Sequence, residues 1–326
     1  MNNADQFLLP EAEFDQVVAL YSRGQLAEAL AAAEPLANTY PHTPALHNLL
    51  GAIYAALTRT DDAKRSYSRA IELDSEYADA HNNLGVLYLE LGDARKAAVC
   101  HRKAMELQPQ HAATHYNLGN ALLTLGDLEA ALASYAEAIA LEPTYAQAHC
   151  NLGIVYRRLG QEEEAIASLR RALDISPKYP TAQFALGNAL QATERVHDAI
   201  AHYEQVIAAT PIHAEAHNNL GLAYMALRKF SDAEKHLRRA VHINPQNTQF
   251  HQHLASALSA QFKFSEAERS FERALELDPA NGGVLSHLVH VRSRLCHWTD
   301  IENLKQRRDA ALAREPGKWP PYALMV

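Results

Sequence analysis

The stretch from His81 to Pro109 reads HNNLGVLYLELGDARKAAVCHRKAMELQP, and the stretch from His115 to Pro143 reads HYNLGNALLTLGDLEAALASYAEAIALEP. The second begins 34 residues after the first and keeps the same pattern of small, apolar and polar residues. A fixed period of about 20 to 50 residues indicates an array of structural units that stack on one another. We therefore expect the 326 residues to form one repeat array, although their number would suffice for two ordinary globular domains.

The period continues over most of the chain in a frame whose units begin at residues 10, 44, 78, 112, 146, 180, 214 and 248. Positions 7, 8 and 11 of a unit share one face of a helix, and positions 20, 24 and 27 share one face of a second helix. Position 20 is alanine in every unit, and position 8 is glycine from the second unit to the seventh: Gly51, Gly85, Gly119, Gly153, Gly187 and Gly221. Such small residues let two helix axes approach closely, so each unit is predicted to be a tightly packed helix pair.

Turn residues mark where these helices begin and end. Gly24, Gly92, Gly126 and Gly160 lie between the two predicted helices, where a helix end favours a left-handed residue. Asp93 and Asp127 suit the start of the second helix. Position 32 is proline in most units, which ends that helix before the next unit begins.

This pattern resembles the tetratricopeptide repeat, and the resemblance covers about residues 10–281, or eight units. The first unit is degenerate, with Gln16 and Val17 where leucine and glycine are expected. The resemblance implies an all-α fold, a right-handed α-solenoid superhelix of helix-turn-helix repeats, whose concave face is lined by the first helix of each unit. Residues 1–9 then form an N-terminal tail, and residues 282–326 form C-terminal helices and a linker.

Composition excludes several functional classes. The formal net charge is −8, whereas a nucleic-acid-binding protein needs a basic surface, so we expect no nucleic-acid partner. The three cysteines form no C-x-x-C pair, which suits a reducing, cytoplasmic compartment. The N-terminus lacks the features of a secretory signal, and no apolar run approaches the length of a membrane span, so we expect no membrane association.

Histidines recur at position 4 of the unit, as His47, His81, His115, His149, His217 and His251. Equivalent positions in adjacent units are separated by two helix layers of about 8–10 Å each, too far for a shared metal about 2.1 Å from each ligand. We expect these histidines to pack between units. The chain also lacks nucleotide-binding, metalloprotease and catalytic-triad patterns, so we expect no catalytic residues, no cofactor and no metal, and hence no enzymatic activity in this chain.

Asparagines recur on the predicted inner face of the first helices, although asparagine is a weak helix former. They occupy position 6, position 9 and position 5: Asn83, Asn117, Asn151 and Asn219; Asn120 and Asn188; Asn82 and Asn218. A carboxamide carries an acceptor and a donor, like a peptide bond, so this asparagine column is predicted to bind extended protein or peptide segments. The alternative is that these amides bond to neighbouring helices and set the twist of the array, and both can hold at once.

The segment after the repeats carries a second resemblance. A helix leading into Cys296-His297-Trp298-Thr299-Asp300, a charged helix, and the wording AHNNLG and HYNLGNAL resemble the N-terminal part of O-linked N-acetylglucosamine transferases. This resemblance implies that the repeats recruit protein substrates for a UDP-sugar-dependent enzyme, with Asn83, Asn117, Asn151 and Asn219 at the matching groove positions. The chain ends at Val326, where the two glycosyltransferase lobes would begin, so we expect no sugar transfer by this chain itself. The alternative is a stand-alone bacterial tetratricopeptide adaptor unrelated to glycosylation.

Two tryptophans near the C-terminus, Trp298 and Trp319, suggest a surface that needs cover. We therefore expect the tail or its last helix either to pack poorly or to mediate contacts between chains, as in a homodimer.

Overall fold

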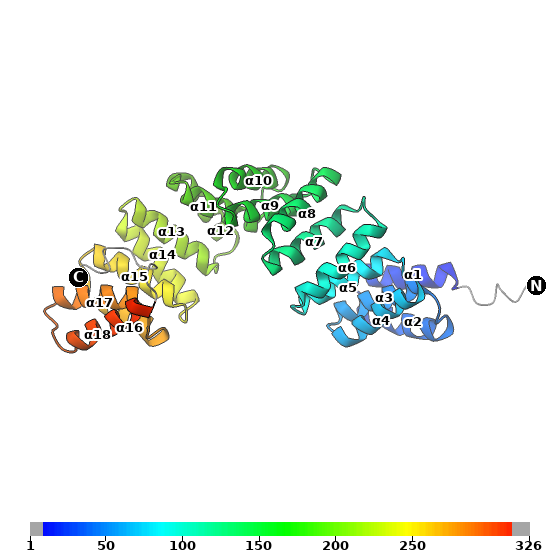
Figure 1. Cartoon of the computed structure of the whole chain (residues 1–326), viewed down its shortest axis with the longest axis horizontal. Coiled ribbons are helices and arrows are strands. Elements are labelled where there is room, and N and C mark those ends of the chain that lie inside the picture. The colour runs from blue at the N-terminus through cyan, green and yellow to red at the C-terminus, as the bar shows by residue number, and fades with distance from the viewer. Residues whose placement is uncertain (1–8, 315–326) are drawn as a thin grey trace, which may run out of the picture. The chain divides into compact units, whose positions relative to one another are not determined.

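The computed structural model describes residues 9–314, and this part of the chain contains eighteen α-helices and no strand (Figure 1). The chain divides between Gln161 and Glu162 into two compact units. Both consist of helices joined by short turns, as the repeat period predicts. None of the described helices has the length and apolarity needed to cross a bilayer.

The first unit contains nine helices in its described part. The first helices of its successive hairpins are α1 (Glu11–Ser22), α3 (Pro44–Ala56), α5 (Ala78–Glu90), α7 (Ala112–Leu125) and α9 (Ala146–Arg158). The second helices are α2 (Leu26–Thr39), α4 (Thr60–Leu73), α6 (Ala94–Leu107) and α8 (Leu128–Leu141). From α1 to α9, each helix packs against the next one of this unit, and first helices also contact the first helix of the following hairpin, as in α1–α3, α3–α5 and α5–α7.

The second unit likewise contains nine helices among the described residues. It begins with α10 (Glu162–Ile175), and its first helices are α11 (Pro180–Ala192), α13 (Ala214–Ala226), α15 (Thr248–Ala260) and α17 (Gly282–Arg294). The second helices are α12 (Val196–Ala209), α14 (Phe230–Ile243), α16 (Phe264–Leu277) and α18 (Ile301–Arg314). The first helices of successive hairpins are in contact here too, as in α11–α13, α13–α15 and α15–α17.

The glycines at position 8 lie against large side chains of the second helix in the same hairpin. A Cβ atom on Gly119 would lie 2.6 Å from the ring of Tyr135, and one on Gly51 would lie 2.4 Å from the ring of Tyr67. Real Cβ atoms do not approach other atoms so closely. The predicted role of these glycines, close approach of two helices, is therefore confirmed where a tyrosine fills position 24.

The turn between the two helices of a hairpin uses a left-handed residue at position 15. Glycine occupies it at Gly24, Gly92, Gly126 and Gly160, as predicted, and Asp93 and Asp127 accept N-cap hydrogen bonds from the next helix. Five other turns hold a non-glycine residue in the same conformation, with φ between 56° and 61°: Thr58, Glu194, Arg228, Phe262 and Cys296. The hairpin packing thus imposes this conformation even where the sequence does not favour it.

The left-handed turn gives a direct stability prediction. A Cβ atom on Gly126 would meet nothing within 4 Å, so the change Gly126→Ala costs only backbone strain, about 1 kcal/mol. The reverse change, Arg228→Gly, relieves the strain at φ 59° and should stabilise the chain by about 0.5 kcal/mol. Urea unfolding midpoints of the two variants should move in opposite directions, and a shift in the same direction would contradict this account.

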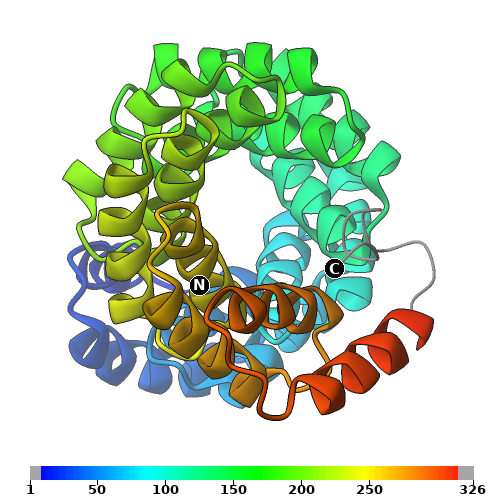
Figure 2. The same ribbon diagram turned by 90° about the vertical axis from the view of Figure 1, so that its left-hand side faces the viewer.

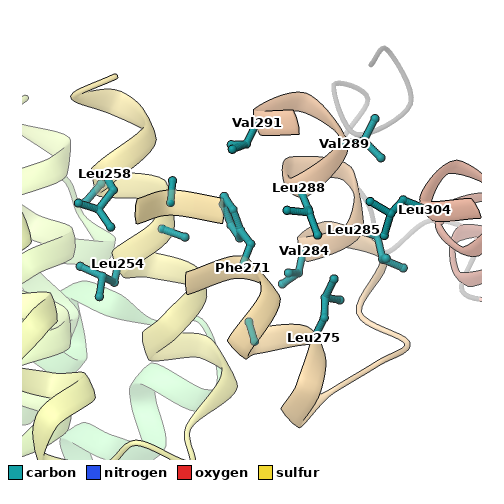
Figure 3. Packing of buried hydrophobic residues seen from close by; sticks show 14 of the residues in the cluster. Leu254, Leu258, Phe271, Leu275, Val284, Leu285, Leu288, Val289, Val291 and Leu304 are labelled. Atoms are coloured by element: carbon teal, nitrogen blue, oxygen red, sulfur yellow. The ribbon is translucent and has the colours of Figure 1, made fainter. Parts of the chain in front are cut away.

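The α17 and α18 helices, orange and red in Figure 2, pack against each other. Their apolar residues belong to the buried cluster of the second unit. Position 8 of this hairpin is Val289 in place of glycine, yet its turn residue, Cys296, has the same left-handed conformation as the others. Figure 3 shows Phe271 of α16 between Leu254 and Leu258 of α15 on one side and side chains of α17 on the other. Val289 belongs to the same cluster as Leu304 of α18.

Ion pairs attach α17 to α16. Arg292 donates to Glu268 at 2.8 Å and to Glu272 at 2.7 Å, and His297 lies 3.1 Å from the other oxygen of Glu268. Trp298 is 62% exposed, and Trp319 lies outside the described residues. The expectation that this surface contacts another chain therefore stays a prediction.

Candidate functional site

The asparagine column, which comprises the eight asparagines at positions 5, 6 and 9, lies entirely on first helices. Its members stand on α5, α7 and α9 in the first unit and on α11 and α13 in the second: Asn82 and Asn83, Asn117 and Asn120, Asn151, Asn188, Asn218 and Asn219. Seven of them are half-buried, and Asn218 is 6% exposed. A half-buried amide must satisfy part of its hydrogen-bonding capacity within the protein.

In the first unit, each position-6 amide nitrogen donates to an oxygen of the preceding hairpin. Asn83 Nδ2 donates to Asn48 Oδ1 at 3.0 Å, and Asn117 Nδ2 donates to Asn82 Oδ1 at 3.2 Å. Asn151 Nδ2 donates to Asn120 Oδ1 at 2.8 Å. These bonds run from one first helix to the next, so the amides stabilise the stacking of successive hairpins.

The second unit repeats this arrangement with one interruption. Ala185 occupies position 6 of α11, and Asn219 Nδ2 of α13 donates to Asn188 Oδ1 of α11 at 2.8 Å. Asn218 donates to Asn219 Oδ1 at 3.0 Å and accepts from the His253 ring of α15 at 2.8 Å. A histidine ring therefore replaces the amide donor at position 6 of the last of these helices.

Side chains of the second helices form hydrogen bonds with several of these amide oxygens. Tyr135 Oη donates to Asn120 Oδ1 at 2.7 Å, and Tyr203 Oη donates to Asn188 Oδ1 at 2.9 Å. The His101 ring, which is fully buried, bonds Asn82 Oδ1 at 3.1 Å, and burial lowers the pKa of His101 to about 4. Sequence reasoning missed these supports, although tyrosine at position 24 together with asparagine at position 9 is a signal that could have shown two of them.

Three oxygens of the column stay available. Within the described residues, Oδ1 of Asn83, Asn117 and Asn151 accepts no hydrogen bond. The second amide hydrogen of Asn83 and Asn117 is likewise unused, whereas Asn151 Nδ2 also lies within hydrogen-bond distance of the Tyr116 and Tyr135 hydroxyls. The structure thus contains the predicted bonds between neighbouring helices. It also leaves the Oδ1 atoms of Asn83, Asn117 and Asn151 free to accept hydrogen bonds from a partner.

The first unit has a pocket of about 630 Å³ that includes Asn83 of the asparagine column in its wall. We name it the N-terminal pocket. Its walls come from α1, α3 and α5, with Tyr67 of α4 and Tyr77 of the α4–α5 turn. Asn48 and Asn83 both line it, and Asn48 Nδ2 lies 3.5 Å from the Tyr77 hydroxyl. The remaining wall is mainly apolar: Phe14, Val18, Ala45, Leu49, Ala52, Ala55, Ala56, Val86 and Leu87.

The histidines at position 4 have a structural role that the sequence did not reveal. Each ring Nε2 lies within hydrogen-bond distance of the carbonyl oxygen six residues earlier, at 2.8 Å for His115 and Pro109 and at 3.3 Å for His217 and Pro211. The same contact recurs at His47, His81, His149 and His251. Gln183 Nε2 donates to Pro177 in the same way, so the common function is to satisfy a carbonyl at the end of the preceding helix.

No three histidine, cysteine, aspartate or glutamate side chains within residues 9–314 come together as a metal site.

Comparison with known families bears directly on these helix pairs. Models described as tetratricopeptide repeats match residues 116–180, 184–248, 76–144 and 248–281, and one described as a TPR repeat matches residues 51–92. The chain belongs to the tetratricopeptide repeat family. These matches meet or overlap over most of residues 51–281, where the frame read from the sequence places seven of the repeats. A comparison with curated proteins gave no match.

Solved tetratricopeptide structures show the same fold. The Cut9–Hcn1 hetero-tetramer of the APC/C has a TM-score of 0.63 at 16% identity, with 89% of this chain and 57% of that chain covered. PilF of Pseudomonas aeruginosa has a TM-score of 0.59 at 20% identity, with 65% and 97% covered. YrrB, described as a TPR protein with an unusual peptide-binding site, has a TM-score of 0.50 at 24% identity, with 61% and 98% covered. At these identities the likeness establishes the fold only.

Proposed function

We propose that this tetratricopeptide repeat chain is an interaction scaffold that binds extended polypeptide segments along its asparagine column. The observation that carries this proposal is the set of unpaired Oδ1 atoms at Asn83, Asn117 and Asn151, together with the pocket in which Asn83 lies. An extended segment presents backbone N–H donors and carbonyl acceptors that match a carboxamide. Recognition of this kind depends little on the side chains of the partner.

The bonds between neighbouring amides support binding by holding each carboxamide in one orientation. Asn82 Oδ1, for example, accepts from both Asn117 and the buried His101 ring. A side chain that is already ordered loses less conformational entropy when a partner binds, and this favours affinity. The structural and binding roles of the column are therefore compatible. YrrB is a tetratricopeptide protein whose solved structure is described as having a peptide-binding site, and this supports the same class of partner here.

A quadruple variant tests this proposal. We expect Asn83→Ala, Asn117→Ala, Asn151→Ala and Asn219→Ala together to abolish binding of peptides selected from a random library against the wild-type chain. Each change also removes at least one hydrogen bond between hairpins, worth about 1 kcal/mol, so the unfolding midpoint should fall while the helical circular dichroism at low temperature is retained.

Tyr54→Phe is the matched control, because it removes a hydrogen bond of 2.7 Å to Glu34 of the preceding hairpin and involves none of the column amides. Its unfolding midpoint should fall by about as much as each lost hydrogen bond lowers the midpoint of the quadruple variant, and its peptide affinity should be unchanged. Equal losses of affinity in the control and the quadruple variant would show that the column acts only through stability.

The biological context of this scaffold is a finer proposal. The resemblance of residues 296–300 and of the asparagine-rich repeats to O-linked N-acetylglucosamine transferases supports recruitment of protein substrates for glycosylation. The alternative is an adaptor with no link to sugar transfer. The reading frame that follows Val326 in the genome separates them, because a glycosyltransferase parent requires several hundred further residues of alternating strands and helices. A stop codon there would favour the adaptor.

A further inference from the structure

Three tyrosines occupy position 24 of a hairpin and lie under the glycine at position 8: Tyr67, Tyr135 and Tyr203. Tyr135 and Tyr203 donate their hydroxyl hydrogens to the asparagine at position 9, Asn120 and Asn188. Position 9 of the Tyr67 hairpin is Ala52, which offers no acceptor. No other described residue forms a hydrogen bond with the Tyr67 hydroxyl, although Tyr67 is only 4% exposed.

The space that an asparagine would fill belongs to the N-terminal pocket. Tyr67 and Ala52 both line this pocket, and Ala55 and Ala56 enlarge it further along α3. Tyr67 lines the pocket and its hydroxyl is not fully buried, so a polar group that enters the pocket can replace water as the hydrogen-bond partner of this hydroxyl. The Tyr67 hydroxyl is therefore positioned to bond a polar group that enters the pocket.

The charge of the lining residues determines which kind of ligand group the N-terminal pocket favours. Among the described lining residues, Glu90 of α5 is the one formally charged side chain, and it forms no ion pair within residues 9–314. Burial, followed by the neighbouring Tyr21 and Glu90, raises the pKa of Tyr67, so its hydroxyl is neutral at physiological pH. An uncompensated carboxylate beside tyrosine rings disfavours an anion and favours a cation.

We propose that the N-terminal pocket binds a lysine or arginine side chain of the extended segment, with its charge at Glu90 and one N–H donated to the Tyr67 hydroxyl. The aliphatic part of such a side chain would pack against Ala52, Ala56 and Leu87, as long basic side chains commonly do. Glu90 is exposed and stays solvated by water without a ligand, so its carboxylate attracts a positive charge at the pocket wall, and a neutral side chain would lack that attraction. This inference rests on the proposed peptide binding and adds a preferred residue to it.

The test uses the full chain and two labelled nine-residue peptides of alternating serine and valine, one with a central arginine and the other with citrulline. Citrulline keeps the shape of arginine and lacks its charge. Fluorescence anisotropy should show about fivefold tighter binding of the arginine peptide at low salt, where charge pairing is strongest. Equal binding of both peptides would overturn this inference and leave the proposed function intact. Failure of both to bind at millimolar concentration would count against both proposals.

Two variants locate the effect. Glu90→Gln should reduce the preference for arginine over citrulline to about twofold or less, whereas Glu129→Gln, an exposed carboxylate on α8, should leave it unchanged. Ala52→Asn installs the amide that Asn120 and Asn188 provide elsewhere, so it should bond the Tyr67 hydroxyl and occupy the part of the pocket beside it. This variant should unfold at the same or a higher urea concentration and bind the arginine peptide only as well as the citrulline peptide. If Glu90→Gln and Ala52→Asn both prefer the arginine peptide over the citrulline peptide as strongly as the wild type does, the proposed site is wrong.

Discussion

Gly119→Leu should destabilise the first unit by about 3 kcal/mol, more than any substitution at an exposed position of the same helices. The leucine side chain would start at a Cβ only 2.6 Å from the Tyr135 ring, and Tyr135 is fully buried. The ring cannot move aside without breaking the hydrogen bond from its hydroxyl to Asn120. The α7 and α8 helices would have to separate, which disturbs packing on both sides of the hairpin.

Urea unfolding followed by circular dichroism measures this effect. Thr124→Leu places the same side chain at an exposed position of α7 and should change stability by no more than about 0.5 kcal/mol. If the midpoints of Gly119→Leu and Thr124→Leu agree, the hairpin has room at position 8 and the role assigned to its glycines is incorrect.

Glu234→Gln should cost the second unit about 2 kcal/mol at neutral pH. Glu234 accepts hydrogen bonds from Lys263 at 2.6 Å, from Arg238 at 2.8 Å and from Gln261 at 2.9 Å, and its side chain is 13% exposed. Burial by itself raises the pKa of this carboxyl, but the three hydrogen bonds outweigh it and lower the pKa from its ordinary value of 4.5 to about 2. The network joins α14 to the turn between α15 and α16, so its loss weakens contact between hairpins.

The pH dependence follows from the lowered pKa. Because the folded state holds the carboxylate more strongly than the unfolded state, this stabilisation is complete above pH 4.5 and is lost as the pH falls from 4.5 towards 2. Unfolding free energies of the wild type and Glu234→Gln should therefore converge over this range. Glu163→Gln removes an exposed pair with Arg195 and should cost less than about 1 kcal/mol at any pH. A constant difference between the wild type and Glu234→Gln from about pH 7 down to about pH 2.5 would contradict the assignment.

Local sequence information determined the helix pairs of this protein. The 34-residue step, the alternation of small and large residues within each unit, and the turn glycines depend on contacts inside one hairpin, which repeat in the sequence itself. The positions of Asn83, Asn117, Asn151 and Asn219 on the first helices follow from the same frame. The degenerate first unit also forms its helix pair, with Val17, Ala29 and Ala33 buried together.

The partners of these side chains were decided by tertiary structure. Asn83 and Asn48 are 35 residues apart, Asn151 and Asn120 are 31 apart, and the acceptor changes from position 5 to position 9 between one hairpin and the next. A frame of equivalent positions cannot predict that change, because it depends on how two neighbouring helices are displaced and on what lies beneath them. Tertiary structure also decided the left-handed conformation of Phe262 and the lack of a hydrogen-bond partner at the Tyr67 hydroxyl. Packing of α15 against α16 within their hairpin imposes the first, and Ala52 creates the second by leaving space where two other hairpins place an amide.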